Sequence, residues 1–215
     1  MNKSISIAFV VAFLWSPPGC RNCSDNSQHH WQDTAAEQIS VQRYSNCDHG
    51  YYVDLPDGFV AHGAKPPSPN HGFVINLADP GNTADALSKT LSRRIFVSNT
   101  ANYQDLPSLN AIVESELHSM KAEATAFRVL ERVPTKLGGL DATLVRVRYQ
   151  VDAQNVDELD IFAYRSPRSG DVGDNIYVLG LITPESMYSS DKEVFDKIRQ
   201  GFHLTGPTTG SCSND

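Results

Sequence analysis

Hydrophobic residues between positions 107 and 124 recur at spacings of three and four, as they do on one face of an amphipathic helix. The residues that set this spacing are Leu109, Ile112, Val113, Leu117, Met120 and Ala124. Asp105 and Ser108 are both suitable N-caps for this helix. A second helix is predicted to begin near Ser190, because Ser190 and Glu193 have capping-box spacing, and to end at Gly201.

Elsewhere the pattern changes to the alternation of β-strands. The β-prone runs are 51–53, 58–60, 73–77, 94–98, 127–133, 142–151, 159–165 and 175–183. The last four are separated by connections too short for helical crossovers, which predicts an antiparallel meander. The sequence therefore predicts an α+β fold, an α/β/α sandwich with a mostly antiparallel sheet.

The first residues are typical of a targeting segment. Lys3 precedes an apolar stretch from residue 5 to residue 15, which is too short to span a bilayer. We therefore expect residues 1–19 to be a signal peptide and the protein to reach the periplasm or cell envelope. Gly19 before Cys20 matches a lipoprotein signal, whereas Pro17 and Pro18 do not, so lipidation of Cys20 and simple secretion both stay open.

The remaining boundaries follow from composition. Polar residues without an apolar period predict a flexible linker over 20–47, a folded domain over 48–205 and a disordered tail over 206–215. The four cysteines are Cys20, Cys23, Cys47 and Cys212, all at the margins of the predicted domain. In an oxidising compartment a disulfide between Cys47 and Cys212 would tie the two ends of the domain together, and free or lipidated cysteines are the alternative.

Composition and motifs narrow the function. Hydrophobic residues make up 40% of the chain and charged residues 20%, as in globular proteins. A net charge of −7 argues against nucleic acid as a partner. Glu114 and His118 lie one helical turn apart but offer only two metal ligands. No GxSxG, HExxH or phosphate-binding glycine loop occurs, so we expect no enzyme activity, no metal and no cofactor.

The order of motifs resembles the PsbP-like α/β/α sandwich family, which includes bacterial envelope proteins of the DcrB and LpqN type. The resemblance rests on Leu55-Pro56 with Gly58-Phe59, the Gly138 to Ala142 turn, and the strand from Ile176 to Leu181. It implies a domain that binds other proteins and carries no shared catalytic motif. Some exported members neutralise secreted toxins, so an immunity protein is one alternative function. An unrecognised hydrolase or small-ligand binder is another.

One strand face is a candidate for partner binding. Arg146, Arg148 and Gln150 share a face of the strand over 142–151, and in one hairpin register they lie across from Tyr164, Phe162 and Asp160. Arginine and tyrosine side by side suit a protein interface. The alternative is that the second helix layer covers this face and the arginines pair with acids. The leading hypothesis is an exported, non-enzymatic envelope protein that binds another protein through this face or through a 152–158 loop. Contact with the membrane is expected only through the signal peptide or a lipid anchor.

Overall fold

The computed structural model describes residues 38–47, 49–64, 72–77, 93–102, 105–166 and 175–205. The chain divides into two units, Met1–Ala36 and Glu37–Asp215, and all described residues belong to the second. None of the helices among them is long and apolar enough to cross a membrane.

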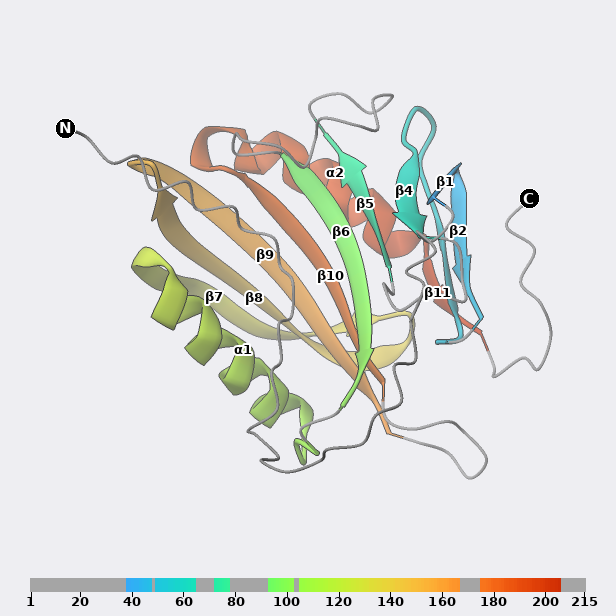
Figure 1. Ribbon diagram of the computed structural model, residues 1–215, viewed down its shortest axis with the longest axis horizontal. Helices are drawn as coiled ribbons and strands as arrows, with labels where there is room; N and C mark the ends of the chain where they lie inside the picture. The colour runs from blue at the N-terminus through green and yellow to red at the C-terminus, as the bar shows by residue number, and fades with distance from the viewer. Residues whose placement is uncertain are drawn as a thin grey trace, which may run out of the picture. The chain divides into compact units, whose positions relative to one another are not determined.

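An eight-stranded sheet forms the centre of the domain (Figure 1). Its strands, in spatial order, are β1 (Gln38–Val41), β4 (Ala61–Ala64), β5 (Gly72–Asn76), β6 (Arg94–Ala101), β10 (Asn175–Pro184), β9 (Gln154–Arg165), β8 (Leu140–Val151) and β7 (Thr125–Leu137). A smaller sheet has the order β11 (Phe202–Leu204), β3 (Tyr51–Asp54) and β2 (Arg43–Asn46). Every strand pair among the described residues is antiparallel.

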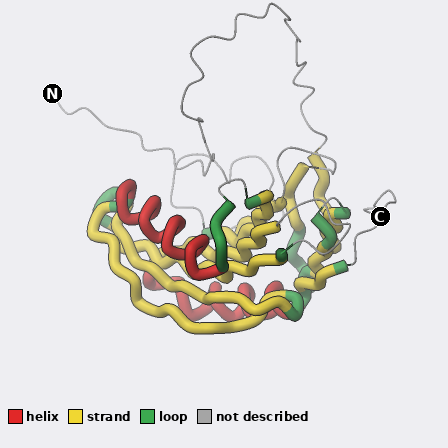
Figure 2. The backbone as a smooth tube through the Cα atoms, turned by 90° about the horizontal axis from the view of Figure 1, so that it is seen from below, coloured by secondary structure: helices red, strands yellow, loops and turns green. Residues whose placement is uncertain are grey.

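One helix covers each face of the large sheet (Figure 2). Helix α1 (Leu109–Glu123) begins at its N-cap Ser108, whose hydroxyl accepts a hydrogen bond from the Ala111 N–H, and contributes Val113 to one hydrophobic cluster. Helix α2 (Tyr188–Gln200) follows the 3₁₀ turn η1 (Glu185–Met187) and contributes Phe195 to the other cluster. The predicted α/β/α sandwich with an antiparallel sheet is therefore confirmed.

The turn between β8 and β9 differs from the prediction. Asp152 and Ala153 both have positive φ, 48° and 65°, and they alone connect the strands, so Gln154 is already paired with Val151. Residues 154–158 are therefore strand, and the predicted 152–158 loop is wrong. Two-residue hairpin turns with left-handed backbone usually carry Asn-Gly or Asp-Gly, so Asp-Ala is a weak signal for one.

The predicted register is wrong as well, because the shorter turn moves every pair. Arg146 lies opposite Leu159 and Arg148 opposite Asp157, whereas the predicted register has Tyr164 and Phe162 there. A shift by an odd number of residues moves a whole set of side chains to the other face of the sheet.

Ordered structure also begins earlier than predicted. Strands β1 and β2 lie within the expected 20–47 linker, and Tyr44 of β2 is fully buried. These strands are four residues long and mostly polar, so the alternation of apolar and polar residues along them is too short to indicate a strand. Near the other end, α2 begins at Tyr188, and Ser190 lies inside the helix, where its hydroxyl donates to the Met187 carbonyl. The predicted signal peptide and C-terminal tail lie outside the described residues.

Tight packing at the centre of the sheet gives a first prediction. A Cβ on Gly180 of β10 would overlap the ring of Phe96 on β6 and crowd the Asp160 carboxylate on β9. Gly180→Ala should therefore lower the free energy of unfolding by about 1–3 kcal/mol, measured by urea denaturation. The double variant Gly180→Ala/Phe96→Leu should recover part of this loss, because it shortens the overlapping ring. Additive losses in the double variant would contradict this account.

Candidate functional site

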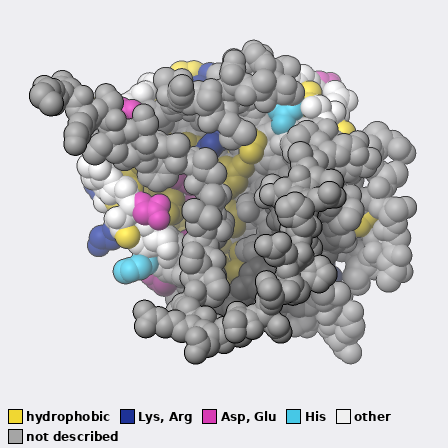
Figure 3. Space-filling view, viewed as in Figure 1, with side chains coloured by type: hydrophobic (Ala, Val, Ile, Leu, Met, Phe, Trp, Pro, Cys, Tyr) yellow, Lys and Arg dark blue, Asp and Glu magenta, His cyan; other side chains and the backbone are white. Residues whose placement is uncertain are grey.

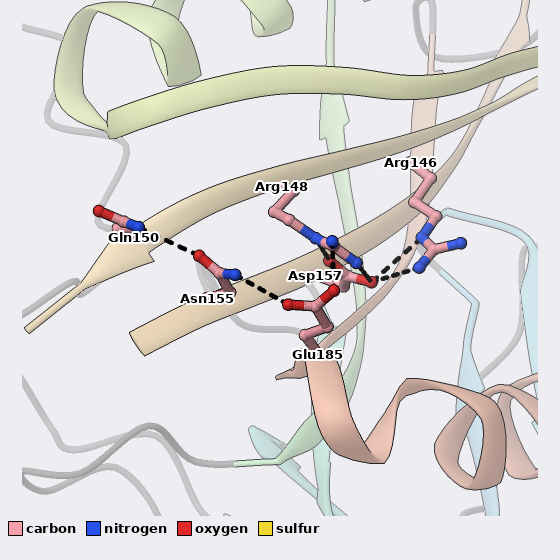
Figure 4. Close-up of polar contacts among 6 residues, drawn as sticks. All are labelled: Arg146, Arg148, Gln150, Asn155, Asp157 and Glu185. Carbon is pink, nitrogen blue, oxygen red and sulfur yellow. Dashed lines mark hydrogen bonds and ion pairs between the residues drawn. The ribbon is translucent and has the colours of Figure 1, made fainter. Parts of the chain in front are cut away.

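The predicted arginine face is an ion-pair network between β8, β9 and η1 (Figure 4). Asp157 accepts hydrogen bonds from Arg148 Nε at 2.6 Å and Nη2 at 3.0 Å, and from Arg146 Nε at 3.2 Å. Arg148 also pairs with Glu185 of η1. Gln150 donates to Asn155 Oδ1 at 3.2 Å, and Asn155 in turn donates to Glu185 Oε2 at 2.8 Å. The polar side chains of this face thus satisfy one another.

Because the network is largely buried, it helps to hold β8, β9 and the start of α2 together. The Asp157 side chain is fully buried, while those of Arg146 and Arg148 are 23% and 16% exposed. Burial on its own would raise the pKa of the Asp157 carboxyl, but the hydrogen bonds from Arg148 and Arg146 outweigh it and hold the pKa below its ordinary value. The Arg146 guanidinium also lies over the Tyr188 ring of α2, 3.5 Å from its centroid. Helix α2 therefore packs beside this face, and the arginines pair with acids there.

Tyr164 does not join the group. It lies two residues after Phe162 on β9, and Phe162 packs in the cluster with α1, so Tyr164 faces the opposite side of the sheet from Arg146. Of the predicted partner-binding residues, Arg146, Arg148 and Gln150 lie together and Tyr164 does not. Whether any of them contacts a partner stays a prediction.

The network predicts an asymmetric response to mutation. The double variant Arg146→Ala/Arg148→Ala leaves Asp157 as a buried, unpaired charge and should cost about 3–5 kcal/mol of unfolding free energy in urea titrations. Asp157→Asn should cost less, because the two arginines it releases are partly exposed and can be hydrated. Equal losses in the two variants would show that burial of Asp157 does not dominate. Because the double arginine variant is destabilised, loss of a partner in it would not identify an interface.

The predicted Cys47–Cys212 disulfide stays a prediction, because Cys212 lies outside the described residues, as do Cys20 and its lipidation. The described chain does bring the two ends of the domain together. The Thr205 N–H donates to the Gly50 carbonyl at 2.8 Å, and the Gly50 N–H donates to the Cys47 carbonyl at 3.3 Å.

Sequence reasoning missed an exposed apolar surface at the edge of the sheet. Strand β7 is the last strand in the sheet order, and most of its 13 residues are exposed. The large hydrophobic side chains that are exposed among the described residues all lie on it: Val129 at 46%, Leu130 at 43% and Val133 at 38%. Val129 and Leu130 are adjacent, and neighbouring exposed apolar residues often mark an interaction site.

A groove adjoins this strand. It has a volume of about 510 Å³ and is lined by Glu114, Leu117, His118, Lys121, Phe127, Val129 and Arg132, from α1 and β7. Arg132 forms an ion pair with Glu114 and donates to Asn110 Oδ1 at 2.7 Å, which fastens β7 to α1. Charged and histidine side chains gather over the α1 side of the molecule, at the left of Figure 3. We call the groove together with the adjacent Leu130 the β7 surface; Val133 lies opposite Leu144 and extends on the other face of the sheet.

Glu114 and His118, considered above as two metal ligands, both line this groove. Glu114 is engaged by Arg132. No group of three or more His, Cys, Asp or Glu side chains in the described part of the chain is arranged to hold a metal ion.

A second polar feature lies buried beneath α1. Glu158 and Asp160 of β9 are 9% and 5% exposed; Glu158 Oε2 accepts a hydrogen bond from the Tyr149 hydroxyl at 2.9 Å, and Asp160 Oδ1 has no partner. Burial raises the pKa of Glu158 to about 7 and raises that of Asp160 well above its ordinary value; the neighbouring Glu158 raises the pKa of Asp160 further. Burial also raises the pKa of Glu116 on α1. Neither Glu158 nor Asp160 lines the α1–β7 groove.

These carboxyl groups predict a pH-dependent stability. Because the pKa of Glu158 is higher in the folded protein than in the unfolded chain, its contribution is fully present below about pH 4 and is lost as the pH rises through about 7. We expect the unfolding free energy to fall by about 3 kcal/mol between pH 4 and pH 8, and Glu158→Gln to flatten that fall. Urea titrations of Glu158→Gln and of Glu123→Gln, an exposed control on α1, at both pH values measure this. Unchanged pH dependence in Glu158→Gln would refute it.

Comparison with known proteins supports the fold alone. No protein-family model and no curated protein matches the sequence. Among solved structures, the chain is similar to the cyanobacterial PsbP protein CyanoP from Synechocystis sp. PCC 6803, with a TM-score of 0.50, 17% identity, and coverage of 77% of this chain and 92% of that chain. The fold is therefore PsbP-like.

Two further structures are similar. A protein of unknown function from Pseudomonas aeruginosa, PA94, described as a putative regulator, has a TM-score of 0.50 and 13% identity over 74% of this chain and 99% of that chain. LpqN of Mycobacterium tuberculosis, involved in cell envelope biogenesis, has a TM-score of 0.45 and 9% identity over 81% of this chain and 94% of that chain. At 13% identity the likeness to PA94 concerns the fold alone and carries no activity or partner.

Proposed function

We propose that this protein is an exported, non-enzymatic envelope protein that binds another protein through the β7 surface. The observation that carries the proposal is the exposure of Val129 and Leu130 side by side on an edge strand, next to a groove lined by apolar and charged side chains. Export rests on the signal-like residues 1–19, which precede the described part of the chain.

The chemistry of the β7 surface suits a protein partner. Leu117, Phe127 and Val129 offer apolar contact area, while His118 and Lys121 supply polar groups around it. Protein interfaces typically combine apolar contact area with polar groups. An edge strand also presents backbone N–H and C=O groups on its outer side, which can pair with a strand of another chain.

Partner capture tests the proposal. Purified protein immobilised on beads should recover a specific protein from envelope extracts, and Val129→Asp/Leu130→Asp should reduce that recovery at least tenfold, because two charges would be desolvated in the contact. The matched control is Ser189→Asp/Gln200→Asp, which places two charges at exposed positions of α2. Equal recovery by wild type and the β7 variant would rule out this surface.

The identity of the captured protein also distinguishes the alternatives. Recovery of a secreted toxin, with loss of its toxicity in the complex, would identify an immunity protein. The hydrolase or small-ligand alternative would be supported by turnover or by binding of a small molecule that Val129→Asp/Leu130→Asp leaves unchanged.

A further inference from the structure

We propose that the β7 surface also pairs with a second copy of this chain, with the two β7 strands antiparallel about a two-fold axis between Val129 and Leu130. This inference rests on the proposed function, because it assigns an occupant to the same surface. It would join two eight-stranded sheets edge to edge into one continuous sheet.

The bulge in β7 gives the strand the necessary geometry. Arg128 lies opposite Arg148 and Glu131 opposite Arg146, so both extend on the α2 face of the sheet. In a regular strand, two residues three positions apart point to opposite faces. Here the register shifts by one residue between Val129 and Glu131, which brings Arg128 and Glu131 to the same face.

The same bulge aligns the other face. Val129 lies opposite Val147 and Arg132 opposite Val145, so both extend on the α1 face, where they line the groove with Phe127. Arg128 and Glu131 thus share one face, and Phe127 and Arg132 share the other, although each pair straddles the bulge. Antiparallel pairing of two copies needs this property, because opposite residues must extend on the same side of the joined sheet.

Charge then selects one register. With the axis between Val129 and Leu130, Arg128 lies opposite the second copy's Glu131 twice, and Val129 lies opposite its Leu130 twice. A shift by one residue in either direction breaks the face match. It also places Arg128 opposite Arg132 in one direction. A shift that places Glu131 opposite the second copy's Glu131 is also disfavoured, because like charges would lie opposite each other.

The charges that this register would pair are available. Among the described residues, Arg132 is engaged by Glu114 and Lys136 by Asp141, whereas Arg128 and Glu131 make no ion pair. Arg128 and Glu131 are both exposed, as are Val129 and Leu130 between them. Pairing would thus cover the most exposed apolar side chains and give Arg128 and Glu131 an ion-pair partner. It also ends before Pro134, which cannot donate a backbone hydrogen bond to a neighbouring strand.

Charge exchange tests the register. Sedimentation equilibrium of the purified full chain should give twice the monomer mass at micromolar concentrations. Arg128→Glu alone and Glu131→Arg alone should each weaken the dimer about tenfold or more, because each places like charges opposite each other. An equimolar mixture of the two variants should restore a dimer, since every Glu then faces an Arg. Circular dichroism confirms that each variant is folded.

The outcomes separate this inference from the proposed function. A monomeric wild type overturns the inference, as does a mixture that stays monomeric while wild type dimerises. If wild type is monomeric but partner capture still depends on Val129 and Leu130, the proposed function stands without the dimer. If the mixture restores the dimer and partner capture ignores Val129→Asp/Leu130→Asp, the dimer stands and the partner binds elsewhere.

Discussion

The two-residue turn at Asp152 and Ala153 determines how the central sheet is assembled. It sets the register of β8 against β9. These two strands carry the polar side chains that lie beside α2 and beneath α1: Arg146, Arg148, Asp157, Glu158 and Asp160. With that register Asp157 lies between Arg146 and Arg148, where its burial is compensated by charged hydrogen bonds. A longer turn would bring other residues opposite the arginines and leave Asp157 without them. The local backbone at two residues therefore decides whether a buried charge is tolerated.

The same register explains why the predicted 152–158 loop is wrong. In isolation Asp157 and Glu158 indicate a solvated loop, because carboxylates are rarely buried without partners. In the structure they occupy a central strand: Asp157 extends toward α2 and is neutralised by arginines, whereas Glu158 and Asp160 extend toward α1 and have raised pKa values. The two faces of one strand thus differ: arginines pair with the acid on the α2 side, whereas burial raises the pKa of both acids on the α1 side.

Several predictions that depended on local signals were confirmed. The apolar period of α1 and its Ser108 cap, the glycine turn at Gly138 and Gly139, and the antiparallel meander all follow from neighbours in sequence. The helix start at Ser190 and the 152–158 loop also rested on local signals and were wrong. The β7 surface depended instead on which strands lie side by side. The sequence of 125–137 does not show that β7 is an edge strand. Its edge position follows from distant strands, because β10 pairs with both β6 and β9 and so places β7 at the end of the sheet. The exposed surface was therefore invisible before the topology was known.

Topology also limits where a partner of a PsbP-like domain can bind here. Helix α2 is fastened over one face by Arg146 and Tyr188, and α1 packs against β7, β8 and β9 on the other, so much of both faces is covered within the chain. Edge strands usually resist pairing through charges, bulges and proline, and β7 has all three. Its charges, however, alternate in sign around the bulge, and its proline lies toward one end. These features exclude most registers and leave one in which apolar and charged residues both match, so the same devices that prevent indiscriminate association would confer specificity.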